Sequence, residues 1–187
     1  MPMNEALITP GPLLSLAYTR WELLGPIPMP HRMHSYRAVS SDNTVHLWAL
    51  AAPSGTVSYR LHSDFPEHWF LSATCPNDDA ITAAAFAAAR TSTYGIATDG
   101  TGTHRTVTEA LLEAGWSAEM LYHRGTVAEL VFASPGGGTL ARLLTGSTDH
   151  GSQPHWQITD SHTDGPAIAD LITPGPVLVA YLLTAAA

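Results

Sequence analysis

Arginines close to aromatic residues are the first feature of this sequence that could carry chemistry. An arginine neutralises phosphate charge and an aromatic ring stacks on a base, so the two together on a sheet are typical of single-stranded nucleic acid binding. The alternative is that the rings pack in the core and the arginines are solvated or paired with the excess acids. The candidate contacts are one tyrosine and four arginines on predicted strands or turns: Arg37, Tyr59, Arg60, Arg124 and Arg142.

A second group of residues has side chains of the types that ligate metals. Histidines and carboxylates can hold zinc or another divalent ion, but the spacings here match no known metal motif. The group comprises His150, His155 and His162 with Asp149, Asp160 and Asp164. We predict that this group binds no metal, and we predict the same for the shorter set of His62, Asp64 and His68. A hydrolytic or metal enzyme is the alternative that the larger group leaves open.

The sequence has no signature of nucleophilic catalysis. Cys75 precedes a predicted helix, whose N-terminus can lower a thiol pKa, but its counterpart near the C-terminus is Thr173, which favours a structural role. No GxSxG motif is present. The glycines of segment 91–103 fit neither a dinucleotide fingerprint nor a P-loop, so we interpret this segment as a flexible linker. We therefore predict no enzymatic activity and no cofactor.

Composition indicates a globular intracellular protein. Of the 187 residues, 45% are hydrophobic and 13% are charged, which argues against disorder. The net charge of −8 weakens a nucleic-acid function without excluding it, because a local basic patch can oppose the overall sign. The single cysteine fits a reducing cytoplasm. We recognise neither a signal peptide nor an apolar run long enough to span a membrane.

One stretch of sequence occurs twice. Residues 44–61 align without a gap on residues 126–143, at an offset of 82, and seven of the 18 positions are identical. The pentapeptide ITPGP of residues 8–12 recurs at 172–176, at twice that offset. Most identities suit turns and core positions. The pair Arg60 and Arg142 has no evident packing role, so it is the repeat's strongest functional candidate.

Periodicity and turn residues predict four helices and nine strands. The helices are expected at 11–19, 80–90, 106–114 and 175–185, and a proline-rich connector at 21–34. The strands are expected at 36–39, 45–51, 57–62, 69–73, 117–122, 127–133, 139–144, 155–159 and 167–171. The helix at 80–90 is apolar nearly all round and is predicted to be buried.

Matching positions of the repeat also predict which strand faces are apolar. Trp48 and Leu50 align with Leu130 and Phe132, which suggests that these four side chains face the core. On the following strand Tyr59 shares a face with its apolar neighbours and Arg60 points to the other side. We divide the chain into a first repeat at 1–92 and a second at 93–187, which are expected to share one core.

The second repeat resembles the actinobacterial SPDY domain, a family of unknown function that often occurs in tandem and in mobile elements. The resemblance is carried by Gly115-Trp116, Ser134-Pro135-Gly136, Arg142-Leu143, His155-Trp156 and Thr173-Pro174. The first repeat is more divergent and lacks the Gly-Trp start, and neither copy has the aspartate of the family's turn. The resemblance implies a tandem architecture and no particular activity.

Taken together, these features predict an α+β protein. We expect two antiparallel sheets of three to four strands, each followed by an apolar helix, with Whirly- or Pur-like packing as an analogy at the level of fold. The predicted function is non-enzymatic binding of single-stranded nucleic acid in the cytoplasm. The alternative is a protein-interaction or scaffold module, which could form a homo-oligomer.

Overall fold

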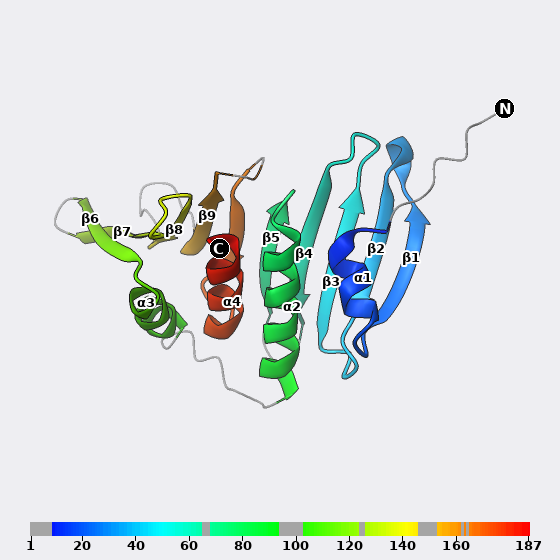
Figure 1. Cartoon of the computed structure of the whole chain (residues 1–187), viewed down its shortest axis with the longest axis horizontal. Helices are drawn as coiled ribbons and strands as arrows, with labels where there is room; N and C mark the ends of the chain where they lie inside the picture. The colour runs from blue at the N-terminus through cyan, green and yellow to red at the C-terminus, as the bar shows by residue number, and fades with distance from the viewer. Residues whose placement is uncertain are drawn as a thin grey trace.

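The computed structural model describes residues 9–64, 68–93, 103–123, 126–145, 153–161, 163 and 165–187, and Figure 1 shows their arrangement. The first half comprises α1 (Gly11–Ala17), β1 (Glu22–Pro28), the short 3₁₀ turn η1 (Pro30–Arg32), β2 (His34–Val39), β3 (Val45–Ala51), β4 (Val57–Ser63), β5 (Trp69–Thr74) and α2 (Asp78–Thr93). The second comprises α3 (Thr103–Glu113), β6 (Ser117–His123), β7 (Thr126–Ala133), β8 (Thr139–Leu144), β9 (His155–Asp160), β10 (Ala167–Asp170) and α4 (Gly175–Ala185).

All ten strands form one antiparallel sheet, in the order β1-β2-β3-β4-β5-β10-β9-β8-β7-β6. The predicted α+β class and antiparallel pairing are confirmed. The prediction of two separate sheets is wrong, because β10 pairs with β5 through Ile168 opposite Ser72 and Ala169 opposite Leu71. Joining the two edges satisfies backbone groups that each smaller sheet would leave unpaired. Duplication of the chain and Whirly-like packing remain predictions.

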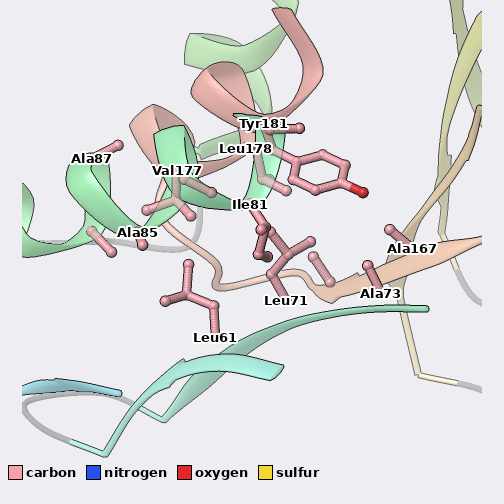
Figure 2. Close-up of a cluster of buried hydrophobic side chains, with 14 of the residues drawn as sticks. Leu61, Leu71, Ala73, Ile81, Ala85, Ala87, Ala167, Val177, Leu178 and Tyr181 are labelled. Atoms are coloured by element: carbon pink, nitrogen blue, oxygen red, sulfur yellow. The ribbon is translucent and has the colours of Figure 1, made fainter. Parts of the chain in front are cut away.

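The described helices α1 to α4 lie on one side of the sheet (Figure 1). Away from the edge strands β1 and β6, most strand side chains on that side are buried. Leu61 and Leu71 lie beneath Ile81 of α2 and Val177 of α4 (Figure 2). A single cluster of buried hydrophobic residues includes side chains from both halves of the chain. None of the described helices combines the length and apolarity that crossing a bilayer requires.

Helix α2 is buried on several sides, as its composition predicts. Asn77 Oδ1 accepts a hydrogen bond from the amide of Asp79 at 2.9 Å, which satisfies one free N–H of the first turn. Asp78 and Asp79 place negative charge at the positive end of the helix dipole. The small alanine side chains allow α2 to pack closely between α1 and α4 and onto the sheet.

The opposite side of the sheet is not covered by any of the described helices, and we call it the open face. Side chains alternate along β4, so that Tyr59 and Leu61 face the helices while Arg60 is exposed. Arg142 on β8 is likewise exposed between the buried Ala141 and Leu143. Both arginines therefore lie on the open face.

Segment 21–34 is not only a connector, because residues 22–28 form the edge strand β1. Pro26 and Pro28 argue against a strand here, since proline lacks an amide hydrogen. An edge strand tolerates proline, because one side of its backbone needs no partner. The pairing of β1 with β2 also shifts register between Leu24 and Ile27.

The predicted apolar face of β3 is also wrong. Trp48 and Leu50 lie on the open face, and their neighbours Leu47 and Ala49 face the helices. The β3–β4 and β7–β8 hairpins differ by one residue in register, since Trp48 lies opposite Arg60 whereas Val131 lies opposite Arg142. An alignment without a gap therefore matches opposite faces of β3 and β7.

Candidate nucleic-acid interface on the open face

Three of the four predicted arginines lie on one line across the open face, perpendicular to the strands. Cα pairing connects the line through successive strands without interruption. From β2 to β8 its members are Arg37, Trp48, Arg60, Ser72, Ile168, Gln157 and Arg142, and we call it the arginine row. Arg124 lies outside the described residues. The row joins residues that are far apart in sequence into one continuous surface feature.

The pairing also fixes the spacing along the row. Arg37 and Arg60 are two strands apart, which corresponds to about 10 Å between their backbones. Arg60 and Arg142 are four strands apart, or about 19 Å. A ligand that contacts all three side chains must therefore be extended and must run across the strands.

Two of these arginines lie over aromatic rings. The guanidinium carbon Cζ of Arg37 is 5.3 Å from the ring centroid of Trp48. Cζ of Arg60 is 4.8 Å from the ring centroid of Phe70. Trp48 remains 41% exposed. Cation–π contact of this kind orients both guanidinium planes. Arg60 is exposed, whereas Arg37 is half-buried and its Nε is enclosed.

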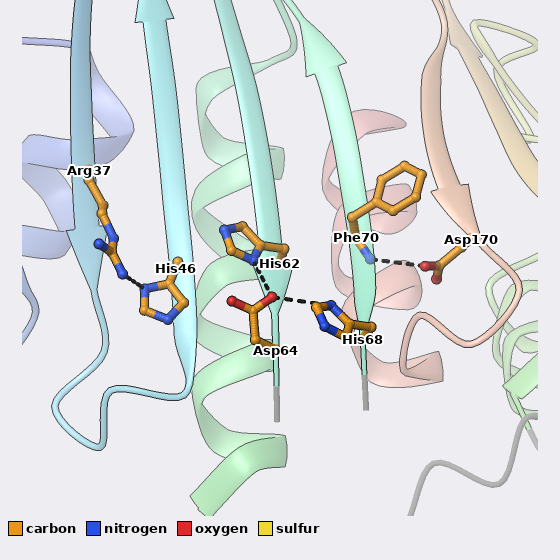
Figure 3. Close-up of polar contacts among 7 residues, drawn as sticks. All are labelled: Arg37, His46, His62, Asp64, His68, Phe70 and Asp170. Carbon is orange, nitrogen blue, oxygen red and sulfur yellow. Dashed lines mark hydrogen bonds and ion pairs between the residues drawn. The ribbon is translucent and has the colours of Figure 1, made fainter. Parts of the chain in front are cut away.

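The rings of His46, which is buried, and His62, which is half-buried, lie next to the row (Figure 3). Their rings stack at 5.2 Å between centroids and 26° between planes. Nη2 of Arg37 lies 2.6 Å from Nδ1 of His46. A guanidinium can only donate, so this nitrogen must be the acceptor and His46 must be neutral. Burial, followed by the charge of Arg37, lowers the pKa of His46 and thus favours the neutral ring.

Asp64 lies between two histidines at the end of β4 (Figure 3). Its Oδ1 is 3.4 Å from Nδ1 of His62 and 3.2 Å from Nδ1 of His68. Burial lowers the pKa of His62, and the nearby carboxylate only partly opposes this shift. In the part of the chain that the structure describes, no three histidines, cysteines or acids are arranged to hold a metal ion.

The predicted histidine and aspartate group is described only in part. His150, His162, Asp149 and Asp164 lie outside the described residues, as does most of the 91–103 linker. His155 is on β9, where its Nδ1 lies 2.9 Å from the carbonyl oxygen of Gln153. The prediction that this group binds no metal therefore stays a prediction.

Asp170 connects the row to the junction between the two halves (Figure 3). Its Oδ2 accepts a hydrogen bond from the amide of Phe70 at 3.3 Å. Its Oδ1 lies 2.8 Å from the hydroxyl of Thr173, which also lies 2.8 Å from the carbonyl oxygen of Phe70. Burial raises the pKa of Asp170, although these contacts and the charge of Arg60 oppose the shift. Thr173 of the second ITPGP segment thus connects β5 to the start of α4.

Tyr59 does not belong to the interface. Its side chain is buried on the helix-facing side, and its hydroxyl lies 3.5 Å from Oδ1 of Asp78. Burial raises the pKa of this hydroxyl above its usual value. The grouping of Tyr59 with the arginines is therefore corrected: the residue precedes Arg60 in the chain, and successive strand residues point to opposite faces.

Comparison with protein-family models, with curated proteins and with solved structures found no match. The resemblance to the SPDY domain therefore stays a prediction that the quoted motifs alone support. The interpretation of the open face consequently depends on its own geometry.

The aromatic members of the interface were not predicted as contacts. The ungapped repeat match pairs Trp48 with Leu130 and therefore predicts a core position for it. Phe70 and His46 lay in predicted strands without any signal that distinguished them. Strict alternation from Arg60, combined with the β3–β4 pairing, places Trp48 and His46 on the open face. The strand register was therefore the missing information.

Proposed function

We propose that the protein binds single-stranded nucleic acid on the open face, centred on β2 to β5. The observation that carries this proposal is the continuous arginine row, in which Arg37 and Arg60 lie over Trp48 and Phe70. Phosphates would contact the guanidinium groups, and bases would stack on the exposed ring of Trp48. Charge for the backbone and rings for the bases are the two elements that single-strand recognition needs.

The local charge of this region supports the proposal despite the net charge of −8. Asp170 is close enough to Arg60 for the two charges to interact, and its oxygens already have partners in Phe70 and Thr173. Asp64 lies at the end of β4 between two histidines. The acids Asp78 and Asp79 belong to α2 on the other side of the sheet. An extended anion can therefore meet Arg37 and Arg60 before it meets an unpaired carboxylate.

A single strand fits this surface better than a duplex. Stacking on Trp48 needs a base whose face is accessible, and the bases of a duplex are stacked on one another. The surface also presents arginines on strands, without a helix that could enter a major groove among the described elements of this face. We therefore expect weak or no selectivity for sequence and a clear preference for single strands.

The test is an anisotropy titration of a fluorescent mixed-sequence oligonucleotide at low salt. We expect binding that weakens as salt is added, because counterions are released from the phosphates. The combined variant Arg60→Ala and Arg142→Ala should lose most of this binding. A duplex of the same sequence should bind less tightly.

The matched control is Arg105→Ala. Arg105 is an exposed arginine on α3, on the helix side of the sheet, where it pairs with Glu109 at 2.8 Å. Its removal changes the net charge as much as the removal of Arg60 does, so it should leave affinity nearly unchanged. Absence of binding to any oligonucleotide at low salt would refute the proposal, as would equal losses in the Arg105 and Arg60 variants.

A further inference from the structure

The outer edge of the second half is built differently from that of the first. β6 ends the sheet, and its side chains from Ser117 to Tyr122 are all exposed. Three consecutive residues of this edge are large and apolar: Met120 is 54% exposed, Leu121 40% and Tyr122 62%. Leu112 of α3 is a further exposed apolar residue close by in sequence. An exposed apolar strand with free backbone groups is a template for pairing with another strand.

The strand at the opposite edge of the sheet, β1, has features that prevent such pairing. β1 contains Pro26 and Pro28, which have no amide hydrogen to donate. Its register breaks between Leu24 and Ile27, so the edge is not a regular ladder. β6 contains no proline and keeps its single irregularity on the side of β7. Only one of the two edges is therefore suited to continue the sheet.

We propose that β6 pairs with β6 of a second copy of this chain. The pairing is antiparallel, around a two-fold axis that is perpendicular to the sheet and passes midway between the two Leu121 residues. In this register Met120 of each copy lies opposite Tyr122 of the other, and Leu121 lies opposite itself. Both pairs cover apolar surface that water contacts in the single chain.

The strand sequence favours a second copy and restricts the register. A two-fold axis uses the same patch twice and closes after two copies. A register centred on Glu119 would set two carboxylates against each other, which is unfavourable. Centring on Leu121 avoids this contact. The chain already uses the same kind of contact internally, since β5 and β10 join two strand groups by antiparallel pairing.

The geometry of this dimer has a consequence for ligand binding, which rests on the proposed function. A two-fold axis perpendicular to the sheet leaves the open faces of both copies on the same side. The two arginine rows then lie on one continuous surface. An oligonucleotide long enough to reach both rows would bind more tightly than a short one, through effective concentration.

The first test is the mass of the full chain in solution, measured by light scattering after gel filtration without nucleic acid. We expect twice the chain mass of 19.9 kDa at micromolar concentration. The variant Met120→Lys with Tyr122→Lys should be a folded monomer, because both positions are solvent-exposed in the single chain. Ile27→Lys on the β1 edge is the matched control and should remain a dimer. A monomeric unmodified chain, or a dimer that survives in the β6 variant, would overturn the proposal.

The second test concerns the register. Antiparallel partners have Cα atoms about 4.5 to 5.5 Å apart, within the range that a disulfide spans. Leu121→Cys in a Cys75→Ser background should therefore form a covalent dimer on mild oxidation. Glu119→Cys in the same background should not, because position 119 faces a different residue of the second copy. Crosslinking at 119 and not at 121 would overturn the proposed register. Neither test contains oligonucleotide, so failure here is distinct from failure of the proposed function.

Discussion

The two halves of the open face carry the same arginine in different surroundings. Over β2 to β5, Arg60 has Trp48 opposite it on one neighbouring strand and stacks on Phe70 of the other. Over β7 to β9, Arg142 lies opposite Val131 and Gln157. Beyond Arg142 the same line of paired residues continues through Val131 to Glu119, which is acidic. The first half thus combines positive charge with aromatic surface, and the second combines positive charge with aliphatic and acidic neighbours.

This difference shows that a repeated residue does not imply a repeated site. Arg60 and Arg142 are the same type of residue, occupy corresponding strand positions and are both exposed on the open face. Their hairpins differ by one residue in register, so the position opposite each arginine is filled by an unrelated side chain. The binding contribution of each half should follow these neighbours, and matched substitutions in the two halves can measure it.

Among the matched substitutions in the two halves, those in the core should have the largest effect, which is on the free energy of unfolding. Leu61 and Leu143 occupy corresponding buried positions, but Leu61 is 0% exposed beneath α2 and α4, and Leu143 is 7% exposed. Leu61→Ala should lower the free energy of unfolding by about 3 kcal/mol, and Leu143→Ala by about 2 kcal/mol. Urea unfolding followed by circular dichroism measures both values. Equal losses would mean that the two halves are packed alike.

Removal of the exposed ring should have the largest effect on binding. Trp48→Ala should weaken oligonucleotide affinity by about 2 kcal/mol, or roughly 30-fold, because a base loses its stacking partner. Val131→Ala at the corresponding position should change affinity by less than about threefold, since no ring is lost. Anisotropy titrations at one salt concentration give both values. Similar losses in the two variants would contradict the asymmetry.

Removal of single arginines should have a smaller effect. Arg60→Ala should weaken binding roughly 10-fold at low salt, and Arg142→Ala about threefold. The effect is larger at Arg60 because stacking of a base on Trp48 holds the neighbouring phosphate close to this arginine. Removing one arginine that neutralises a phosphate of a single strand should reduce the salt dependence, log K against log salt, by about 0.7. Titrations at several salt concentrations test the two predictions separately. A greater loss of affinity for the Arg142 variant would indicate that the binding site lies on the second half.

The smallest effect should be on pH dependence. The pKa values of His46 and His62 are both lowered, mainly by burial. Below about pH 6.5 the unfolded chain therefore binds protons that the folded chain does not, and the free energy of unfolding falls as the pH decreases. His62→Gln should reduce this dependence, because it removes one of the two histidines whose pKa burial lowers. Urea unfolding between about pH 7.5 and about pH 5.5 provides the measurement.

Local sequence patterns predicted most helices and strands because local chemistry determines them. The Asn77 cap with two acids signals the start of α2, and alternation separates Arg60 from Tyr59 on β4. Sequence pattern does not predict the edge strand β1, because proline disfavours a strand in the interior of a sheet but is tolerated at an edge. In each of these cases the interaction that determines the local structure joins residues close in sequence, or depends on whether the strand borders solvent.

The site was harder to predict because its members meet only through strand register. The pairing of β5 with β10 joins residues nearly 100 positions apart, and no local pattern signals it. The one-residue difference between the hairpins reversed the predicted face of Trp48. As a result the sequence indicated Arg37, Arg60 and Arg142 as separate candidates. It could not reveal that they share a row or that two of them lie over rings.

The central claim is that a single strand binds where Trp48 is exposed, and tryptophan fluorescence tests it directly. Of the five tryptophans, Trp48 is exposed and the other four are buried. Titration with a single-stranded oligonucleotide at low salt should quench a saturable part of the emission. Trp48→Phe should abolish this quenching while anisotropy still detects binding. Binding without quenching in the unmodified chain, or quenching that persists in Trp48→Phe, would contradict the account.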